Sequence, residues 1–183
     1  MKRPIMRQNS DKGTDDCLQR LLIAAGGGRR RLGYVVVANV DALLRYYRDS
    51  EFRRCFQSAE VVLTADRFSG WLMRCLSGVR VPACSPESLL LRVRTLMRST
   101  DRILWIGDTS SLPEGMGTSD IRCLQWEAGA DALANLATCV SFVERQTPFR
   151  FCVLAMGSPQ CELIAHTLSR RGRAAGLVLC VGS

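Results

Sequence analysis

Lysine and histidine are almost absent from this chain. Of the 25 lysine and arginine residues, only Lys2 and Lys12 are lysines, and His166 is the single histidine. The net charge of +8 is therefore carried by arginine. Nucleic acid, phosphorylated ligands and an anionic membrane face would all suit such a charge. The arginines are dispersed rather than interleaved with aromatic residues, apart from the block at 29–31, which argues against nucleic acid as a partner.

Long apolar runs and regular cysteine spacings are also missing. No uninterrupted apolar stretch has the length of a membrane span, and the basic N-terminus lacks the apolar segment of a secretory signal. The nine cysteines include no Cys-x-x-Cys pair, and their number is odd. Zinc sites and disulfide frameworks need closer or more regular spacing. We therefore expect reduced thiols, no metal, no cofactor and a cytoplasmic protein.

The length and composition fit one globular domain. A chain of 183 residues with 47% hydrophobic residues can bury a core of ordinary size. Residues 1–13 are polar and lack periodicity, so we expect a flexible tail followed by a domain over 14–183. A short helix should begin at Cys17, with Asp15 or Asp16 as its cap. The glycines at 26–28 follow no strand, which favours a connector over a phosphate-binding loop.

Apolar runs alternate with helical periodicity along the rest of the chain. We expect strands at 34–38, 61–64, 103–106, 121–126, 149–155 and 176–182. Helices should occupy 40–49 with a continuation to 56, 68–76, a segment from Ser85 or Ser88 to 97, 128–145, and the residues after Pro159. The segment 109–119 should form a loop. This order predicts a single-domain, Rossmann-like α/β fold, with a doubly wound, mostly parallel sheet and helices on both faces.

Polar residues or glycines follow four of these strands. They are Asn39, Asp66, the pair Gly107-Asp108, and Gly157-Ser158-Pro159. Ligands of open α/β sheets bind outside the carboxyl ends of the strands, so these corners could line one crevice. Each also has a purely structural interpretation, as a helix cap or a turn. At the last corner, Ser158 should cap a helix that has Pro159 in its first turn, leaving backbone N–H groups for an anion or a sugar hydroxyl.

Several segments carry a resemblance to a known family. These are residues 34–39, 49–53, 58–63 before Asp66, 80–82, and 157–162 with the closing 181–182. In this order and spacing they resemble the WecG/TagA/CpsF glycosyltransferases, glycosyltransferase family 26, over most of residues 34–183.

The resemblance implies an inverting, metal-independent hexosyltransferase. Such enzymes transfer N-acetylmannosamine, its uronic acid or a related hexose from a UDP-sugar to a polyprenyl-diphosphate-linked acceptor in cell-surface polysaccharide (exopolysaccharide) biosynthesis. Peripheral contact with the inner face of the cell membrane and homo-oligomers belong to the same expectation. The matching positions make Asp66 the general base and Arg80 the residue that neutralises a diphosphate. Substrate binding would fall to Asn39, Gly107, Gly157, Ser158, Pro159 and Gln160.

Among the departures from the family pattern, three single positions bear on the candidate site. Arg67 and Asp108 stand where the family has glycine, and Cys161 stands where it has glutamine. These differences leave a second interpretation open, a catalytically degenerate relative that serves as a binding or assembly partner. Nucleic-acid binding through the basic surface ranks below both.

Overall fold

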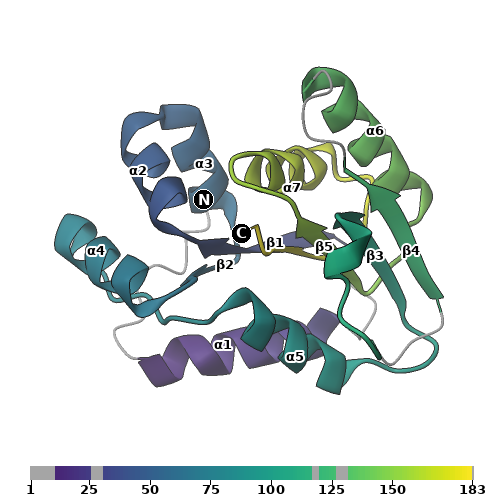
Figure 1. Ribbon diagram of the computed structural model, residues 1–183, viewed down its shortest axis with the longest axis horizontal. Helices are drawn as coiled ribbons and strands as arrows, with labels where there is room; N and C mark the ends of the chain where they lie inside the picture. The colour runs from purple at the N-terminus through teal and green to yellow at the C-terminus, as the bar shows by residue number, and fades with distance from the viewer. Residues whose placement is uncertain (1–10, 26–30, 117–119, 127–131, 183) are drawn as a thin grey trace.

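The computed structural model describes residues 11–25, 31–116, 120–126 and 132–182 (Figure 1). Its elements, in chain order, are α1 Asp11–Ala24, β1 Leu32–Ala38, α2 Val40–Arg48, α3 Ser50–Ser58, β2 Val61–Thr64, α4 Arg67–Ser77, α5 Pro86–Leu96, β3 Arg102–Gly107, the 3₁₀ turn η2 Thr109–Ser111, β4 Asp120–Gln125, α6 Ala132–Arg145, β5 Phe151–Ala155, α7 Gln160–Arg171 and β6 Gly176–Cys180.

The six strands form one sheet in the order β2-β1-β6-β5-β3-β4. Every neighbouring pair is parallel, which confirms the expected doubly wound α/β fold. The register places Ala38 opposite Thr64, and Gly107 opposite both Ala155 and Gln125. All strands therefore end at the same edge, called the carboxyl edge below.

Helices cover both faces of the sheet, because the side chains of each buried strand alternate between two cores. Tyr34 and Val36 of β1 point into a core under α2, α3, α6 and α7. Val35 and Val37 point the other way, into a core closed by α1 and α5. Figure 1 shows these two layers above and below the sheet. Strands buried on both faces explain the unbroken apolar runs in the sequence.

The first helix begins earlier than the sequence suggested. Helix α1 starts at Asp11, so Asp15 and Asp16 lie inside it and do not cap it. Leu18 and Leu22 pack into the core below the sheet, and this burial stabilises a helix whose first turns are polar. The rest of the expected tail, residues 1–10, and the glycines at 26–28 lie outside the described residues.

All nine cysteines lie in the described part of the chain and are free thiols. Burial raises the pKa of Cys55 and Cys139 to about 11, so both thiols are protonated at neutral pH. Within the described ranges, no group of histidine, cysteine or acidic residues is arranged to hold a metal ion. None of the helices described is long and apolar enough to cross a bilayer.

Candidate active site at the carboxyl edge

Asn39 and Asp66 lie at neighbouring positions of the carboxyl edge. Their strands β1 and β2 are paired, and the Ala65 N–H donates to the Ala38 carbonyl at 2.8 Å. Both side chains cap helices. Asn39 Oδ1 accepts from the Ala42 N–H at 2.9 Å, and Asp66 Oδ1 accepts from the Ser69 N–H at 2.7 Å. The structural roles considered from the sequence are thus real, and any ligand contact must be made in addition to them.

Asp66 is an exposed, ionised carboxylate. Hydrogen bonds from the Ser69 backbone and from the Ser69 hydroxyl, the latter at 2.8 Å, lower the pKa of Asp66 below its ordinary value. A carboxylate can accept about four hydrogen bonds, so oxygen lone pairs remain for a ligand. The side chain of Arg67, next in the chain, is also exposed.

Arg80 lies in the connector that follows α4, upstream of the residues that pair with the end of β2. The Pro82 carbonyl accepts from the Thr64 N–H at 3.1 Å, and the Cys84 N–H donates to the Thr64 carbonyl at 2.8 Å. The connector therefore runs along the outer side of β2, because β1 occupies the inner side. Arg80 is exposed there, two residues before Pro82.

The corner between β5 and α7 differs from the one expected. Helix α7 begins at Gln160, and Pro159 occupies the capping position without a side-chain hydrogen bond. The prediction that Ser158 caps this helix is wrong, because Ser158 lies one residue too far upstream and its hydroxyl is buried. Gly157 faces open space, and its carbonyl accepts from the Gln160 N–H at 3.1 Å.

Glu162, a residue that the sequence did not single out as a candidate, is buried beneath this corner. Its side chain is 1% exposed, and the Cys161 thiol donates to Glu162 Oε2 at 3.0 Å. Burial raises the pKa of Glu162 above its ordinary value, although the Cys161 hydrogen bond and the charge of Arg45 act in the opposite direction. In the sequence, Glu162 was part of the segment 157–162 that carries the resemblance, but a carboxyl in the first turn of α7 also suits an exposed residue favoured by the helix dipole.

Gly107 has a structural reason to be glycine. Its φ is +148°, and a Cβ there would lie 2.2 Å from the Ala155 carbonyl oxygen of the neighbouring strand. Asp108 after it is exposed, and it accepts from the Ser110 N–H at 2.9 Å and the Ser110 hydroxyl at 2.6 Å. These bonds lower the pKa of Asp108.

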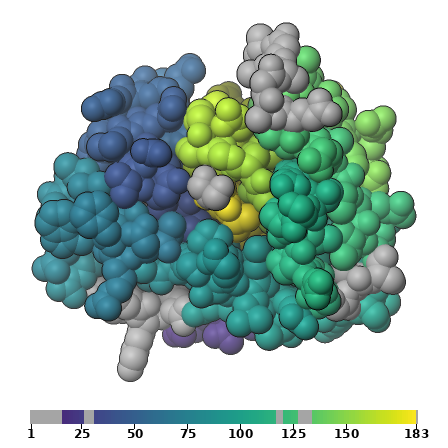
Figure 2. Space-filling view, in the orientation of Figure 1, coloured from purple at the N-terminus to yellow at the C-terminus, as the bar shows by residue number. Residues whose placement is uncertain are grey.

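The four corners share one edge but form two groups. Strands β1, β6 and β5 lie between β2 and β3, so the corners at Asp66 and Gly107 are roughly 19 Å apart at the usual strand spacing. Asn39 and Asp66 make one group, at the β1–β2 half, and Arg80 lies in the connector beside β2. Gly107 and the corner at 157–160 make the other, at the β5–β3 half. The end of β6 lies between them, and Figure 2 shows the yellow C-terminal segment at the bottom of a hollow.

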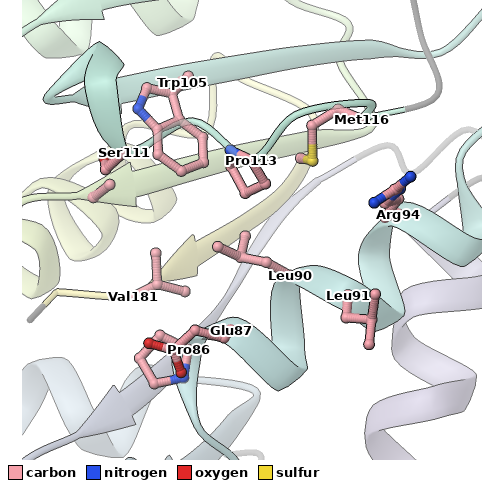
Figure 3. A pocket seen from close by; sticks show the side chains of 11 residues that line it. Pro86, Glu87, Leu90, Leu91, Arg94, Trp105, Ser111, Pro113, Met116 and Val181 are labelled. Atoms are coloured by element: carbon pink, nitrogen blue, oxygen red, sulfur yellow. The ribbon is translucent and has the colours of Figure 1, made fainter.

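Two cavities adjoin these groups. A polar cavity of about 430 Å³ lies between α2 and the corner before α7, and its lining includes Arg45, Arg48 and Ser158. An apolar cavity of about 450 Å³ lies between α5 and the segment after β3, with Leu90, Trp105 and Met116 among its lining residues (Figure 3). Neither Arg45 nor Arg48 stood out in the sequence, because both fit the ordinary surface of a helix.

A comparison with protein families matches residues 5–183 to the model described as the glycosyl transferase WecG/TagA/CpsF family. The chain belongs to this family. A search of curated proteins found no match. Among solved structures, the chain is similar to one described in the words "The highly conserved domain of unknown function 1792 has a distinct glycosyltransferase fold". The identity is 13% and the TM-score 0.55, with 92% of this chain and 82% of that chain covered, so this likeness concerns the fold alone.

As a WecG/TagA/CpsF member, the protein is a glycosyltransferase by family, and its substrates in general are a sugar donor and an acceptor. Its Rossmann-like fold agrees with that assignment. The family match includes the carboxyl edge with both groups of candidate residues.

Proposed function

We propose that the protein transfers a hexose from a UDP-sugar to a polyprenyl-diphosphate-linked acceptor, with inversion and without a metal ion. The observation that carries this proposal is the ionised, exposed carboxylate of Asp66 beside Asn39, at the edge where open α/β sheets bind ligands. Membership of the family supports the reaction class. The N-acetylmannosamine type of sugar and the polysaccharide pathway belong to the proposal too.

The chemistry needs a base and a means of stabilising the leaving group. Asp66 takes the proton of the acceptor hydroxyl while the hydroxyl oxygen bonds to the anomeric carbon. The bond from that carbon to the UDP oxygen breaks on the opposite face, which inverts the configuration. Asp66 is deprotonated at neutral pH, as a base must be, and the Ser69 hydrogen bonds that lower its pKa hold the carboxylate in place while making it a weaker base.

The two groups at the carboxyl edge suit different parts of the substrates. The corner at 157–160, with Gly107 beside it, would hold the nucleotide end of the donor, since Gly157 leaves open space above the backbone. Asn39 would then meet the sugar as it approaches Asp66. Arg80, on the outer side of β2, offers a planar guanidinium that can pair with two oxygens of a diphosphate.

Titration calorimetry with UDP tests the donor site, and UDP release in the presence of a lipid-diphosphate acceptor tests turnover. We expect Asp66→Asn to keep UDP binding and to lower the rate at least 100-fold. Asp108→Asn is the matched control, because Asp108 makes the same pair of bonds to a serine at the other half of the edge. It should retain turnover.

Two results would contradict the proposal. One is the absence of UDP binding together with the absence of turnover for any nucleotide sugar, which would favour the binding or assembly partner instead. The other is an Asp66→Asn variant as active as the control, which would assign the base to another residue.

A further inference from the structure

Two arginines of α2 line the polar cavity beside the corner before α7. Arg45 and Arg48 are one helical turn apart, on the same side of α2, and the cavity of about 430 Å³ lies between them and Ser158. Both side chains are exposed. Figure 1 shows α2 and α7 in the same layer, above the sheet. The cavity therefore joins the helix that Asn39 caps to the corner at 157–160.

Neither arginine has a counter-ion among the described residues. Asp41 precedes Arg45 by one helical turn, but no ion pair joins the two, and Arg48 forms none with any residue that the structure describes. Asp49, which also lines the cavity, accepts from the first N–H groups of α3 at 2.8 and 3.2 Å. Two unpaired guanidinium groups suit a ligand with several anionic oxygens, since each group can donate to two of them.

The opposite wall of the cavity also favours an anion. Pro159, at the capping position of α7, makes no side-chain hydrogen bond, so the positive end of this helix has no side-chain cap. The Ser158 hydroxyl is buried, and no described residue gives it a hydrogen bond of ordinary geometry. Burial raises the pKa of Glu162 beneath the corner, and the charge of Arg45 opposes that rise. The positive charge of α2 is therefore felt at the corner itself.

We infer that Arg45 and Arg48 hold the diphosphate of the nucleotide-sugar donor, an assignment that rests on the proposed function. The resemblance gave the role of neutralising a diphosphate to Arg80. The connector that contains Arg80 pairs with the outer side of β2 through Thr64 and Ala83. Four strand spacings, roughly 19 Å, separate this position from β5. Arg80 is thus too far away to meet a donor bound at the corner that follows β5.

The two diphosphates of the reaction then lie on opposite sides of the candidate base. Asp66, at the end of β2, lies between the connector with Arg80 and the cavity beside α2. The donor diphosphate occupies the cavity, and Arg80 is left for the diphosphate of the acceptor. An acceptor hydroxyl at Asp66 can then approach the anomeric carbon from the face opposite to UDP, as inversion requires.

Calorimetric titration of UDP into the full chain tests the assignment. Arg45→Gln/Arg48→Gln should bind UDP about 10- to 100-fold more weakly than the wild type, because each hydrogen bond to a charged group contributes about tenfold. Arg98→Gln/Arg173→Gln is the matched control, since it removes two exposed arginines elsewhere, and it should bind UDP like the wild type. Arg80→Gln should also bind UDP normally. All these side chains are exposed, so urea denaturation should show similar stabilities.

Other ligands sharpen the result. Uridine, titrated by NMR, should bind Arg45→Gln/Arg48→Gln and the wild type equally, since it carries no phosphate. If uridine binding falls as much as UDP binding, the substitutions damage the corner itself and the assignment is overturned. A loss with a UDP-hexuronate but not with UDP would assign the arginines to a carboxylate on the sugar. Weaker UDP binding in Arg80→Gln alone would return the donor diphosphate to Arg80.

The failure of this assignment can be told apart from the failure of the proposed function. Wild-type UDP binding that Arg45→Gln/Arg48→Gln leaves unchanged overturns the assignment alone. A wild-type protein that binds neither UDP nor inorganic pyrophosphate overturns both. Pyrophosphate binding that depends on the two arginines, in a protein that does not bind UDP, would overturn the proposed donor and keep the cavity as a diphosphate site.

Discussion

The two halves of the carboxyl edge are built by different means. At the β1–β2 half, Asn39 and Asp66 are fixed by side-chain hydrogen bonds to the first turns of α2 and α4, and Asp66 is exposed. At the β5–β3 half, Gly107 lies against the neighbouring backbone, and Glu162 is buried under the corner. Substitutions at the first half should therefore have little effect on the stability of the fold, whereas substitutions at the second half should disturb the core.

The largest loss of stability should follow from adding a methyl group to Gly107, in the second half. Gly107→Ala combines a positive φ with a Cβ 2.2 Å from the Ala155 carbonyl oxygen, so we expect a loss of about 3 to 5 kcal/mol in the free energy of unfolding. Gly157→Ala is the control, since its Cβ would meet nothing within 4 Å. Urea denaturation of both variants measures the difference, and equal stabilities would remove the structural reason given for Gly107.

Much of this architecture could be predicted from the sequence. The unbroken apolar runs that end at Asn39 and Asp66 predicted strands buried on both faces, and the polar residues after them predicted the caps that the structure contains. These features depend on neighbours in the chain. The start of α1 was missed for the opposite reason, because its first turns are polar and its stability comes from packing under a distant sheet.

The separation of the two groups could not be predicted in the same way. Which strand lies beside which is decided by packing between segments far apart in the chain, so nothing local shows that three strands separate Asp66 from Gly107. The burial of Glu162 could not be predicted from the sequence either. It lies in the interior near Tyr34 and Cys55, and its position in the sequence equally suits an exposed first turn of α7. The site roles themselves stay predictions until substrates are tested.

A smaller effect should follow from placing at position 161 the glutamine that the resemblance implied there. Cys161 is buried, and a Cβ on Gly182 would already lie 3.3 Å from its sulfur. We expect Cys161→Gln to cost about 1 to 3 kcal/mol through overpacking. Leu163→Gln, at an exposed neighbour on α7, should stay within about 0.5 kcal/mol of the wild type. Thermal and urea unfolding measure both variants. A Cys161→Gln variant as stable as the wild type would show that the corner opens to accept the longer side chain.

The buried carboxyl should also appear in the pH dependence of stability. Because burial raises the pKa of Glu162, the folded protein holds this proton more tightly than the unfolded chain. The stability that Glu162 adds to the folded state through this proton is complete below the ordinary pKa of 4.5. It is lost as the pH rises through the raised pKa. Glu162→Gln should remove a slope of at most about 1.4 kcal/mol per pH unit in that window. Parallel profiles for variant and wild type would show that Glu162 titrates normally.

The smallest effect on stability should occur at Asp66, and it separates capping from catalysis. Asp66→Ala removes the cap of α4 and should cost about 1 kcal/mol, whereas Asp66→Asn keeps an oxygen for the Ser69 N–H and should cost a few tenths. Since hydrogen bonds lower the pKa of Asp66, the stability it adds is present above its ordinary pKa and lost as the pH falls through the lowered one. Urea denaturation at neutral and acidic pH measures both the cost of losing the cap and the pH dependence of the stability that Asp66 adds. If Asp66→Asn were as unstable as Asp66→Ala, a loss of turnover in Asp66→Asn would reflect a damaged start of α4 rather than the loss of a base.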